Sequence, residues 1–328
     1  MRPYKIMFVG GYHPGQMLGT LFRACERLGH DVLHVPCMGE TEQPEGLMAL
    51  IDSFQPEIIW GFIPCTWHNP ESFQAIVMSS ATLVYWDFDF PQEVVLNPEM
   101  MDRAAPYFDV FVSTDDSKIA CEYADLHGLP RVWLPPVYDA QQPLCSAAPK
   151  TDLLFMGHGY ANGMFQKQPL ARTQRIAMAA TLRESLGRTR LTICGDDSCN
   201  WPEDWCLPHV QWDEHFGWFP RAKVNVGQFC LIAPGKSRHM NFRPVVCLGA
   251  GGFLIQEYHE GLEDCFVDGQ EIVYWTTYKD LVEKCGYYLE HQDEAREIAE
   301  RGRQRVLRDY NAETWMEQVL GEVIARTA

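Results

Sequence analysis

The chain has 328 residues, of which 46% are hydrophobic and 22% charged, and its formal net charge is −17. This composition is that of a globular protein with room for two domains of ordinary size. The negative charge disfavours long nucleic acids and anionic membranes as partners, unless basic residues gather locally. No apolar run approaches the roughly 20 residues of a membrane span, so we expect none.

Twelve cysteines are spread along the chain without a Cys-x-x-Cys pair, and no charged-then-apolar leader follows Met1. We therefore expect reduced thiols and a cytoplasmic protein. Cys194, Cys199, Cys206 and His209 lie within sixteen residues, but the compact spacing of a zinc site is missing. We expect no bound metal.

The first half of the chain alternates strands and helices. Residues 5–9 form an apolar run, a glycine-rich turn follows, an amphipathic pattern covers 17–28, and 31–35 is apolar again. This βαβ pattern predicts a parallel sheet. Further strands are expected at 58–62, 82–86, 110–113 and 132–134. The fold class is therefore α/β, with a doubly wound first domain.

A proline-rich stretch at 135–150 is typical of a linker, and the alternation restarts after it. Strands are expected at 152–157, 190–195, 223–228 and 251–258, with a helix over 172–187. Amphipathic helices fill the tail. We predict a Rossmann-like domain over 1–145, a second over 146–308, and a C-terminal helix over 309–328 that can cross back to the first domain.

Several segments resemble those of one enzyme family. Residues 261–320 are similar to the C-terminal signature of the CgeB-like (spore-maturation type) glycosyltransferases, a bacterial and phage group within the group 1 glycosyltransferases. "KIMFVGGYHPG", "LVYWDFDF", "DLLFMGHGY" and "NFRPVVCLGAGGFLIQEY" resemble other segments of that family. The resemblance implies the GT-B fold, two Rossmann-like domains facing across a cleft. It also implies metal-independent transfer of a sugar from a nucleotide donor, with UDP-sugar expected, to an acceptor hydroxyl.

The donor site needs fixed positive charge and N–H groups for the leaving diphosphate. Lys236, Arg238 and Arg243 lie within eight residues, just before an expected helix N-terminus. They are candidate phosphate ligands, and a solvated surface loop is the alternative. Gly251 and Gly252 either approach the phosphates or form a helix-to-strand turn.

The family segment reads Arg, any residue, an aromatic residue and Glu, and that Glu is placed to hold the ribose hydroxyls. An alignment on the glycines puts Arg243 on the Arg and Val246 on the Glu. Valine accepts no hydrogen bond, and a buried hydroxyl left unpaired costs about 1–3 kcal/mol. Either the segment has degenerated, or another acid such as Glu257 or Glu260 binds the ribose.

The turn after the first strand is expected at the ligand cleft of a doubly wound domain. Gly11 would let the backbone approach a ligand, and His13 has the pKa range of a general base. A capping or surface histidine is the alternative. The turn lacks the full dinucleotide-binding spacing, so a Rossmann oxidoreductase has little support.

Aromatic and acidic residues end the strand at 82–86. Asp87 or Asp89 would accept the proton of the attacking hydroxyl or orient the acceptor, and Trp86 and Phe88 would stack on it. Asp87 and Asp89 are two residues apart, as in the Asp-x-Asp metal pair of other sugar transferases, but the resemblance implies metal-independent transfer, so we expect no metal here. The alternative is a solvated turn.

The resemblance places Asp196, His215 and Trp218 near the base or sugar of the donor, with core packing as the alternative for the last two. Two functions remain open: an active glycosyltransferase, or a nucleotide-binding protein of the same fold without catalysis. The acceptor class is also open, and a modified nucleobase is one narrower option.

Overall fold

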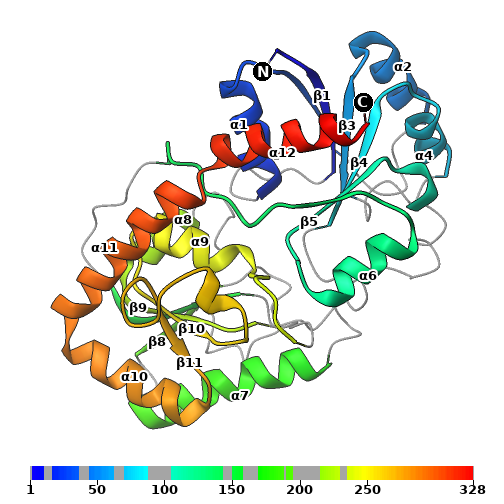
Figure 1. The fold of residues 1–328 in the computed structure, drawn as a ribbon. Helices are drawn as coiled ribbons and strands as arrows, with labels where there is room; N and C mark the ends of the chain where they lie inside the picture. Colours follow the sequence, from blue (N-terminus) through cyan, green and yellow to red (C-terminus); the bar gives the residue numbers. More distant parts are fainter. Residues whose placement is uncertain are drawn as a thin grey trace. The chain divides into compact units, whose positions relative to one another are not determined.

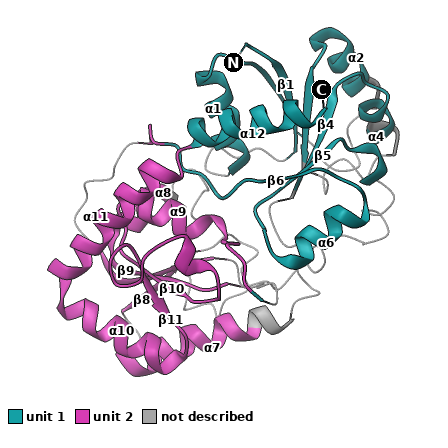
Figure 2. Cartoon of the chain, in the orientation of Figure 1, with its two compact units in different colours: residues 1–139, 233–235, 312–328 teal, residues 140–232, 236–311 magenta. Residues whose placement is uncertain are grey.

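The computed structural model describes residues 2–10, 17–36, 44–62, 70–87, 105–142, 150–157, 169–187, 190–194, 215–229 and 235–327. The chain forms two compact units (Figure 2). The first unit contains residues 1–139, 233–235 and 312–328, and the second contains residues 140–232 and 236–311. The final helix therefore belongs to the first unit.

The first unit contains a six-stranded parallel sheet in the order β2-β1-β3-β4-β5-β6 (Figure 1). Its strands are β1 (Lys5–Val9), β2 (Asp31–Val35), β3 (Ile58–Phe62), β4 (Thr82–Asp87), β5 (Val110–Ser113) and β6 (Arg131–Trp133). The inner strands β1, β3, β4 and β5 are mostly apolar because a sheet covered on both faces has no solvated side.

Helices cover both faces of this sheet. They are α1 (Met17–Arg27), α2 (Pro44–Phe54), α4 (Pro70–Val77), α6 (Lys118–Leu126) and α12 (Ala312–Thr327). Side chains of α2 and α4 pack on Met7, Val9 and Ile59. The next residue of β1 points to the other face, where Phe8 contacts Phe22 of α1. The predicted doubly wound arrangement is confirmed.

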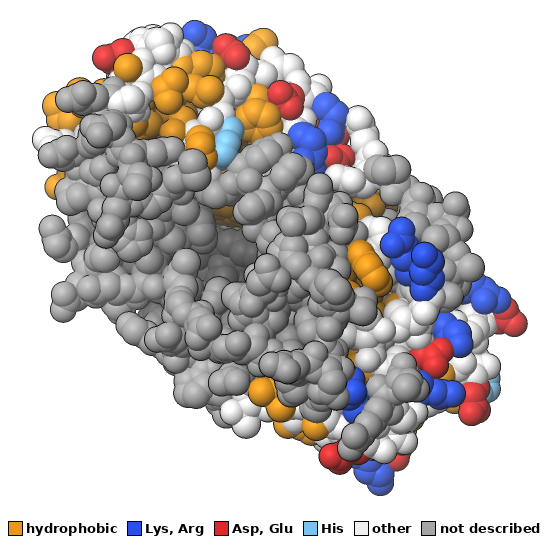
Figure 3. Space-filling view, turned by 180° about the vertical axis from the view of Figure 1, so that it is seen from behind, with side chains coloured by type: hydrophobic (Ala, Val, Ile, Leu, Met, Phe, Trp, Pro, Cys, Tyr) orange, Lys and Arg blue, Asp and Glu red, His pale blue; other side chains and the backbone are white. Residues whose placement is uncertain are grey.

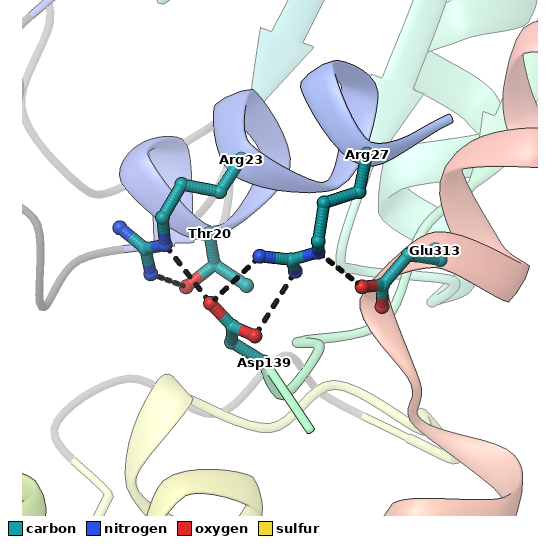
Figure 4. Close-up of polar contacts among 5 residues, drawn as sticks. All are labelled: Thr20, Arg23, Arg27, Asp139 and Glu313. Carbon is teal, nitrogen blue, oxygen red and sulfur yellow. Dashed lines mark hydrogen bonds and ion pairs between the residues drawn. The ribbon is translucent and has the colours of Figure 1, made fainter. Parts of the chain in front are cut away.

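Two arginines of α1 bind the points at which the chain leaves and re-enters the first unit (Figure 4). Arg23 Nε lies 2.9 Å from Asp139 Oδ2, and Arg27 Nη2 lies 3.0 Å from Asp139 Oδ1. Arg27 Nε also lies 2.5 Å from Glu313 Oε1. The backbone N–H of Ala312 donates to the carbonyl of Tyr138 at 3.1 Å. We call Arg23, Arg27, Asp139 and Glu313 the Arg27 cluster.

The second unit contains a five-stranded parallel sheet in the order β11-β10-β9-β7-β8. Its strands are β7 (Thr151–Met156), β8 (Leu191–Cys194), β9 (Ala222–Gly227), β10 (Leu254–Glu257) and β11 (Val273–Trp275). Its helices are α7 (Pro169–Leu186), α8 (His215–Trp218), α9 (Phe242–Gly249), α10 (Tyr278–Glu290) and α11 (Gln292–Asp309). Helices α7 and α10 pack on one face of the sheet, in a core with Val226 and Ile255. Helix α9 covers the other face and packs against α11.

The expected strands match observed ones to within three residues at each end, but β11 was not among them, and the predicted linker differs in part. Val137, Tyr138 and Asp139, in the first part of the predicted linker 135–150, are buried in the first unit. Val137 and Tyr138 are buried by their apolar side chains, and Asp139 is buried by its ion pairs in the Arg27 cluster. The proline content of the stretch did not indicate either contact.

Candidate functional site

The second sheet has a topological switch point between β7 and β9. From β7 the chain passes to β8 on one side, and then to β9 on the other side of β7. Connections that run in opposite directions leave a crevice at the carboxyl ends of the two strands, where open α/β sheets bind ligands. The candidate site is therefore built from Gly157, which follows β7, and Gln228, which follows β9.

Arg243 spans this switch point. Helix α9 begins at Phe242, and the side chain of Asn241 caps it by accepting the N–H of Arg243. From this first turn, Arg243 Nε donates to the carbonyl of Met156 at 2.9 Å, and Nη1 donates to the carbonyl of Gln228 at 3.1 Å. One guanidinium thus connects the carboxyl ends of two neighbouring strands, beside the positive end of the α9 dipole.

A second guanidinium lies next to the first. Arg175 of α7 and Arg243 place their guanidinium carbons 5.5 Å and 5.3 Å from the centroid of the Phe155 ring. A Cβ atom on Gly157 would lie 3.0 Å from Arg243 Nη2 and 3.2 Å from Arg175 Nη1. Gly157 therefore lets both cations approach the backbone, and two adjacent guanidiniums are suited to an anion.

Glu257 is the last residue of β10 and belongs to the same edge of the sheet. Its Oε2 accepts the N–H of Phe229 at 2.9 Å. Burial raises the pKa of Glu257 to about 7, while the Phe229 hydrogen bond and the charge of Arg175 oppose that rise. Burial thus disfavours the charged form of this carboxylate. A raised pKa of this kind is more typical of a functional acid than of a structural one.

One peptide bond joins Arg243 to Glu257. The carbonyl of Gln228 accepts from Arg243, and the N–H of the same peptide, which belongs to Phe229, donates to Glu257. The peptide dipole has its negative end on the cation and its positive end on the carboxylate. The two side chains therefore stabilise one orientation of the segment after β9.

The contacts described for the other two predicted basic ligands involve residues outside this arrangement. Lys236 is exposed, and its Nζ lies 2.7 Å from Asp264 Oδ2. Arg238 is half-buried, and its carbonyl lies 3.8 Å from the Cys265 thiol. Of the three cations predicted for the phosphates, the structure brings Arg243 to the switch point and gives Lys236 an acidic partner.

Gly251 and Gly252 occupy the opposite end of α9 from Arg243. Gly251 has φ +86° and follows the last turn of the helix. A Cβ atom on Gly252 would lie 2.8 Å from Cys247 Sγ and 2.9 Å from Asn225 Nδ2. These glycines form the tight turn into β10, at the amino edge of the sheet, one helix length from the switch point.

Val246 lies in the middle of α9 and is 3% exposed. Its side chain packs in the core, so this helix presents no carboxylate at the family's ribose position. His215 and Trp218 belong to α8, which is separated from the start of β9 by one 3-10 turn, Phe219–Arg221. They therefore lie toward the amino edge of β9, away from Gln228. Nothing is described of the His215 side chain, and Trp218 is half-buried with Arg221 over its ring.

Gly11, His13, Phe88, Asp89 and Asp196 lie outside the described residues. Asp87 is the last residue of β4 and pairs in register with Ser113, and its side chain is not described. Trp86 is 4% exposed in the core of the first unit. The proposed acceptor side of the site is thus described only by the end of this strand.

Sequence reasoning missed Arg175 and Gln228. Arg175 is 2% exposed and lies on the buried stripe of α7 with Met178, Ala179 and Leu182. The available signal was the helical spacing: Arg175 lies three and four residues before the apolar Met178 and Ala179, which places it on the same face of the helix. Gln228 contributes its backbone carbonyl, which accepts from Arg243. The type of a residue does not show that its backbone has such a role.

Within the described residues, no group of three or more metal-binding side chains is found, and no helix is long and apolar enough to cross a membrane. The six cysteines in this part of the chain are free thiols.

Residues 172–321, a little under half of the chain, match the sequence model of a family described as glycosyl transferase-like. The matched segment runs from α7 to α12 and includes Arg175, Arg243 and Glu257. A search of curated protein sequences found no significant match.

Solved structures share the whole fold. Sucrose-phosphate synthase from Thermosynechococcus elongatus has a TM-score of 0.68 at 10% identity, over 99% of each chain. Anabaena Alr3699/HepE, in complex with UDP-glucose, has a TM-score of 0.63 at 10% identity, over 98% of this chain and 100% of that one. A Listeria monocytogenes protein described as a UDP-N-acetylglucosamine 2-epimerase has a TM-score of 0.55 at 12% identity, over 98% of this chain and 95% of that one.

These structural similarities show the fold of the chain. The sequence identities are too low to assign an activity to it. The chain has the GT-B fold of two parallel-sheet α/β domains, and its residues 172–321 are similar to glycosyl transferase-like proteins.

Proposed function

We propose that the protein is a glycosyltransferase of the CgeB-like type, which moves a sugar from a nucleotide donor to an acceptor hydroxyl. The observation that carries the proposal is the position of Arg243, bonded to Met156 and Gln228 across the switch point of the second sheet. The family match over 172–321 supports transfer, and the UDP-glucose complex of HepE supports a UDP-sugar donor.

In this proposal the second unit binds the donor. As the bond between sugar and diphosphate breaks, negative charge grows on the diphosphate oxygens. Arg243 and the positive end of the α9 dipole would stabilise that charge, with Arg175 adding to the local positive potential. These groups supply the role that a metal ion has in other transferases, and we propose that the reaction is metal-independent.

The first unit would bind the acceptor. Its own switch point lies between β1 and β3, and the chain leaves β1 toward Gly11 and His13. We propose His13, Asp87 or Asp89 as the base that accepts the proton of the attacking hydroxyl, with Trp86 and Phe88 near the acceptor. The acceptor can be a small molecule, a protein or a polysaccharide.

The test is a nucleotide panel of UDP, GDP, dTDP, ADP and CMP, read by thermal unfolding. A ligand at 100 times its Kd raises the stability of the folded protein by about 2.7 kcal/mol. We expect a shift with UDP that is lost in Arg243→Met and kept in the control Arg296→Met, since Arg296 is an exposed residue of α11. Stabilisation by none of the five nucleotides, or an equal shift in Arg243→Met, would contradict the proposal.

A nucleotide-binding protein without catalysis is the second candidate, and the buried Val246 in place of the ribose-binding Glu favours it. The two candidates are separated by incubation of the protein with UDP-glucose. Slow release of glucose, or transfer detected by product mass, supports the enzyme. Binding of UDP without either reaction supports the binding protein.

Glycosylation of a modified nucleobase within DNA is a narrower option. Duplex binding needs a concentrated basic surface. Figure 3 shows basic and acidic side chains interspersed on the described part of one face. On α11, Arg296, Arg301 and Arg305 form ion pairs with acids of the same helix. Binding to DNA that does not weaken as salt rises would remove this option.

A further inference from the structure

The Gln228–Phe229 peptide fixes the spacing between a cation and a carboxylate. Arg243 Nη1 is 3.1 Å from the carbonyl oxygen, and Glu257 Oε2 is 2.9 Å from the nitrogen on the other side of the same trans peptide. The oxygen and nitrogen of one peptide are about 2.3 Å apart by standard geometry. The distance from Arg243 Nη1 to Glu257 Oε2 is therefore at most about 8 Å. In a nucleoside diphosphate, a few covalent bonds of the ribose and its 5′ carbon separate the phosphates from the vicinal hydroxyls. Arg243 and Glu257 have a spacing on that scale.

The two ends of this arrangement also have complementary chemistry. A guanidinium donates to phosphate oxygens, whereas a carboxylate accepts from the two O–H groups of a vicinal diol. Phe229 uses one of about four lone-pair sites on Glu257, so further sites are left for a ligand. The part of the ligand that donates hydrogen bonds therefore belongs at β10, and the anionic part belongs at α9.

We propose that Glu257 binds the ribose hydroxyls of the donor nucleotide and replaces the helix carboxylate that is absent at Val246. This assignment rests on the proposed function, because it presupposes a nucleotide at Arg243. It moves the ribose contact from α9 to the end of the neighbouring strand β10, without changing the edge of the sheet that binds the ligand.

Other acids after β10 fit less well. Glu260 is exposed on the loop beyond the strand, and its backbone carbonyl accepts from Ser237. The carboxylate of Glu263 accepts from the N–H of Gly261 and from the hydroxyl of Tyr258 within the same loop. Only Glu257, among these three, is bonded to the peptide that Arg243 also binds.

Two further groups act on Glu257. The charge of Arg175 lowers the pKa of Glu257 and so favours its ionised form, which is the form that accepts hydroxyls. Tyr278, at the start of α10, is close enough that the charge of Glu257 contributes to raising the pKa of the tyrosine. Arg175 of α7 and Tyr278 of α10 are thus both close enough to interact electrostatically with this carboxylate.

The test compares UDP with 2′-deoxy-UDP and 3′-deoxy-UDP, by calorimetry at pH 8. This pH lies above the pKa of about 7, so Glu257 is ionised. We expect the wild-type protein to bind UDP about tenfold more tightly than either deoxy form, as for one lost hydrogen bond to a charged group. Glu257→Gln keeps an oxygen for the Phe229 N–H. It should lower the affinity for UDP by about tenfold more than the affinity for either deoxy form, because each deoxy form keeps only one of the two hydroxyls that Glu257 accepts.

Glu260→Gln is the matched control and should bind all three nucleotides as the wild type does. Glu257→Asp, which shortens the carboxylate, should behave as Glu257→Gln does and guards against misfolding of a single variant. Equal affinity of the wild type for UDP and both deoxy forms would overturn the assignment, as would an equal loss for all three in Glu257→Gln. Absence of any UDP binding by the wild type would instead count against the proposed function.

Discussion

Gly157 lies so close to Arg243 that a Cβ atom on the glycine would be 3.0 Å from the guanidinium nitrogen Nη2. The same atom would lie 3.2 Å from Arg175 Nη1, so both cations are close to one backbone position. The backbone at the end of β7 therefore leaves room for both guanidinium groups only while residue 157 has no side chain.

Gly157→Ala should displace the guanidinium of Arg243 by a few tenths of an ångström and weaken UDP binding several-fold. Arg243 then loses good geometry with Met156 and Gln228, both at about 3 Å in the wild type. The measurement is the Kd for UDP by calorimetry. Gly46→Ala is the control, because a Cβ atom there meets nothing within 4 Å, and its Kd should not change. Unchanged affinity in Gly157→Ala would show that the arginine position tolerates the methyl group.

Glu257 should make the unliganded protein less stable as pH rises. Its folded pKa of about 7 exceeds the ordinary value of 4.5, so the folded state binds more protons than the unfolded state between these values. The free energy of unfolding therefore falls from about pH 4.5 to pH 7 and is lowest above pH 7, by at most about 3 kcal/mol. Glu257→Gln should unfold at a higher temperature than the wild type at pH 8 and at a similar temperature at pH 4.5. A variant that is less stable than the wild type at pH 8 would contradict this sign.

Asp139→Ala should destabilise the first unit by about 2–4 kcal/mol, because Arg23 and Arg27 lose a carboxylate that is only 4% exposed. Denaturant unfolding, followed by the fluorescence of Trp133 and Trp315, which contact each other in this unit, would report the loss. The matched control removes an exposed carboxylate: Glu122→Ala breaks the Lys118–Glu122 pair and should cost under about 0.5 kcal/mol. Equal effects of the two substitutions would mean that the Arg27 cluster behaves as a surface pair.

Gly251→Ala and Gly252→Ala should lower the melting temperature and leave the Kd for UDP unchanged. The first places a side chain at φ +86°, and the second places a methyl group against Cys247 and Asn225, so each should cost about 1–2 kcal/mol. If either variant stayed folded but lost affinity for UDP, the phosphates would have to bind at this turn and not at Arg243.

The sequence predicted the sheets well because buried parallel strands are short apolar runs between turn residues. Lys5–Val9 and Asp31–Val35 match the observed strands residue for residue. It did not predict the burial of Val137–Asp139, where long-range ion pairs with α1 hold the segment, although the boundary between the two units falls within the predicted linker. A carboxylate that packs against a helix more than a hundred residues away leaves no local pattern.

For the candidate site, sequence patterns found Arg243 and Glu257 but not the relationship between them. That relationship passes through the backbone of Gln228 and Phe229, which any residue types could supply. The two interpretations of Gly251 could not be separated either, since the sequence does not show which end of α9 lies at the carboxyl edge. The raised pKa of Glu257 depends on the burial of its carboxylate, which only the fold produces.

The contact of Ala312 with Tyr138 gives the chain the topology of a domain insertion. Apart from residues 233–235, the polypeptide leaves the first unit after Asp139 and rejoins it at Ala312, where the N–H of Ala312 donates to the carbonyl of Tyr138 at 3.1 Å. When the inserted second unit folds, its two ends come close together. The chain between Asp139 and Ala312 then acts as a shorter loop, which the first unit closes when α12 packs on α1. Because the entropy cost of closure grows with the logarithm of loop length, a misfolded insert would also weaken the packing of α12 on α1. Conversely, a short glycine-rich bridge from Asp139 to Ala312 is the natural way to excise the second unit and express the first alone.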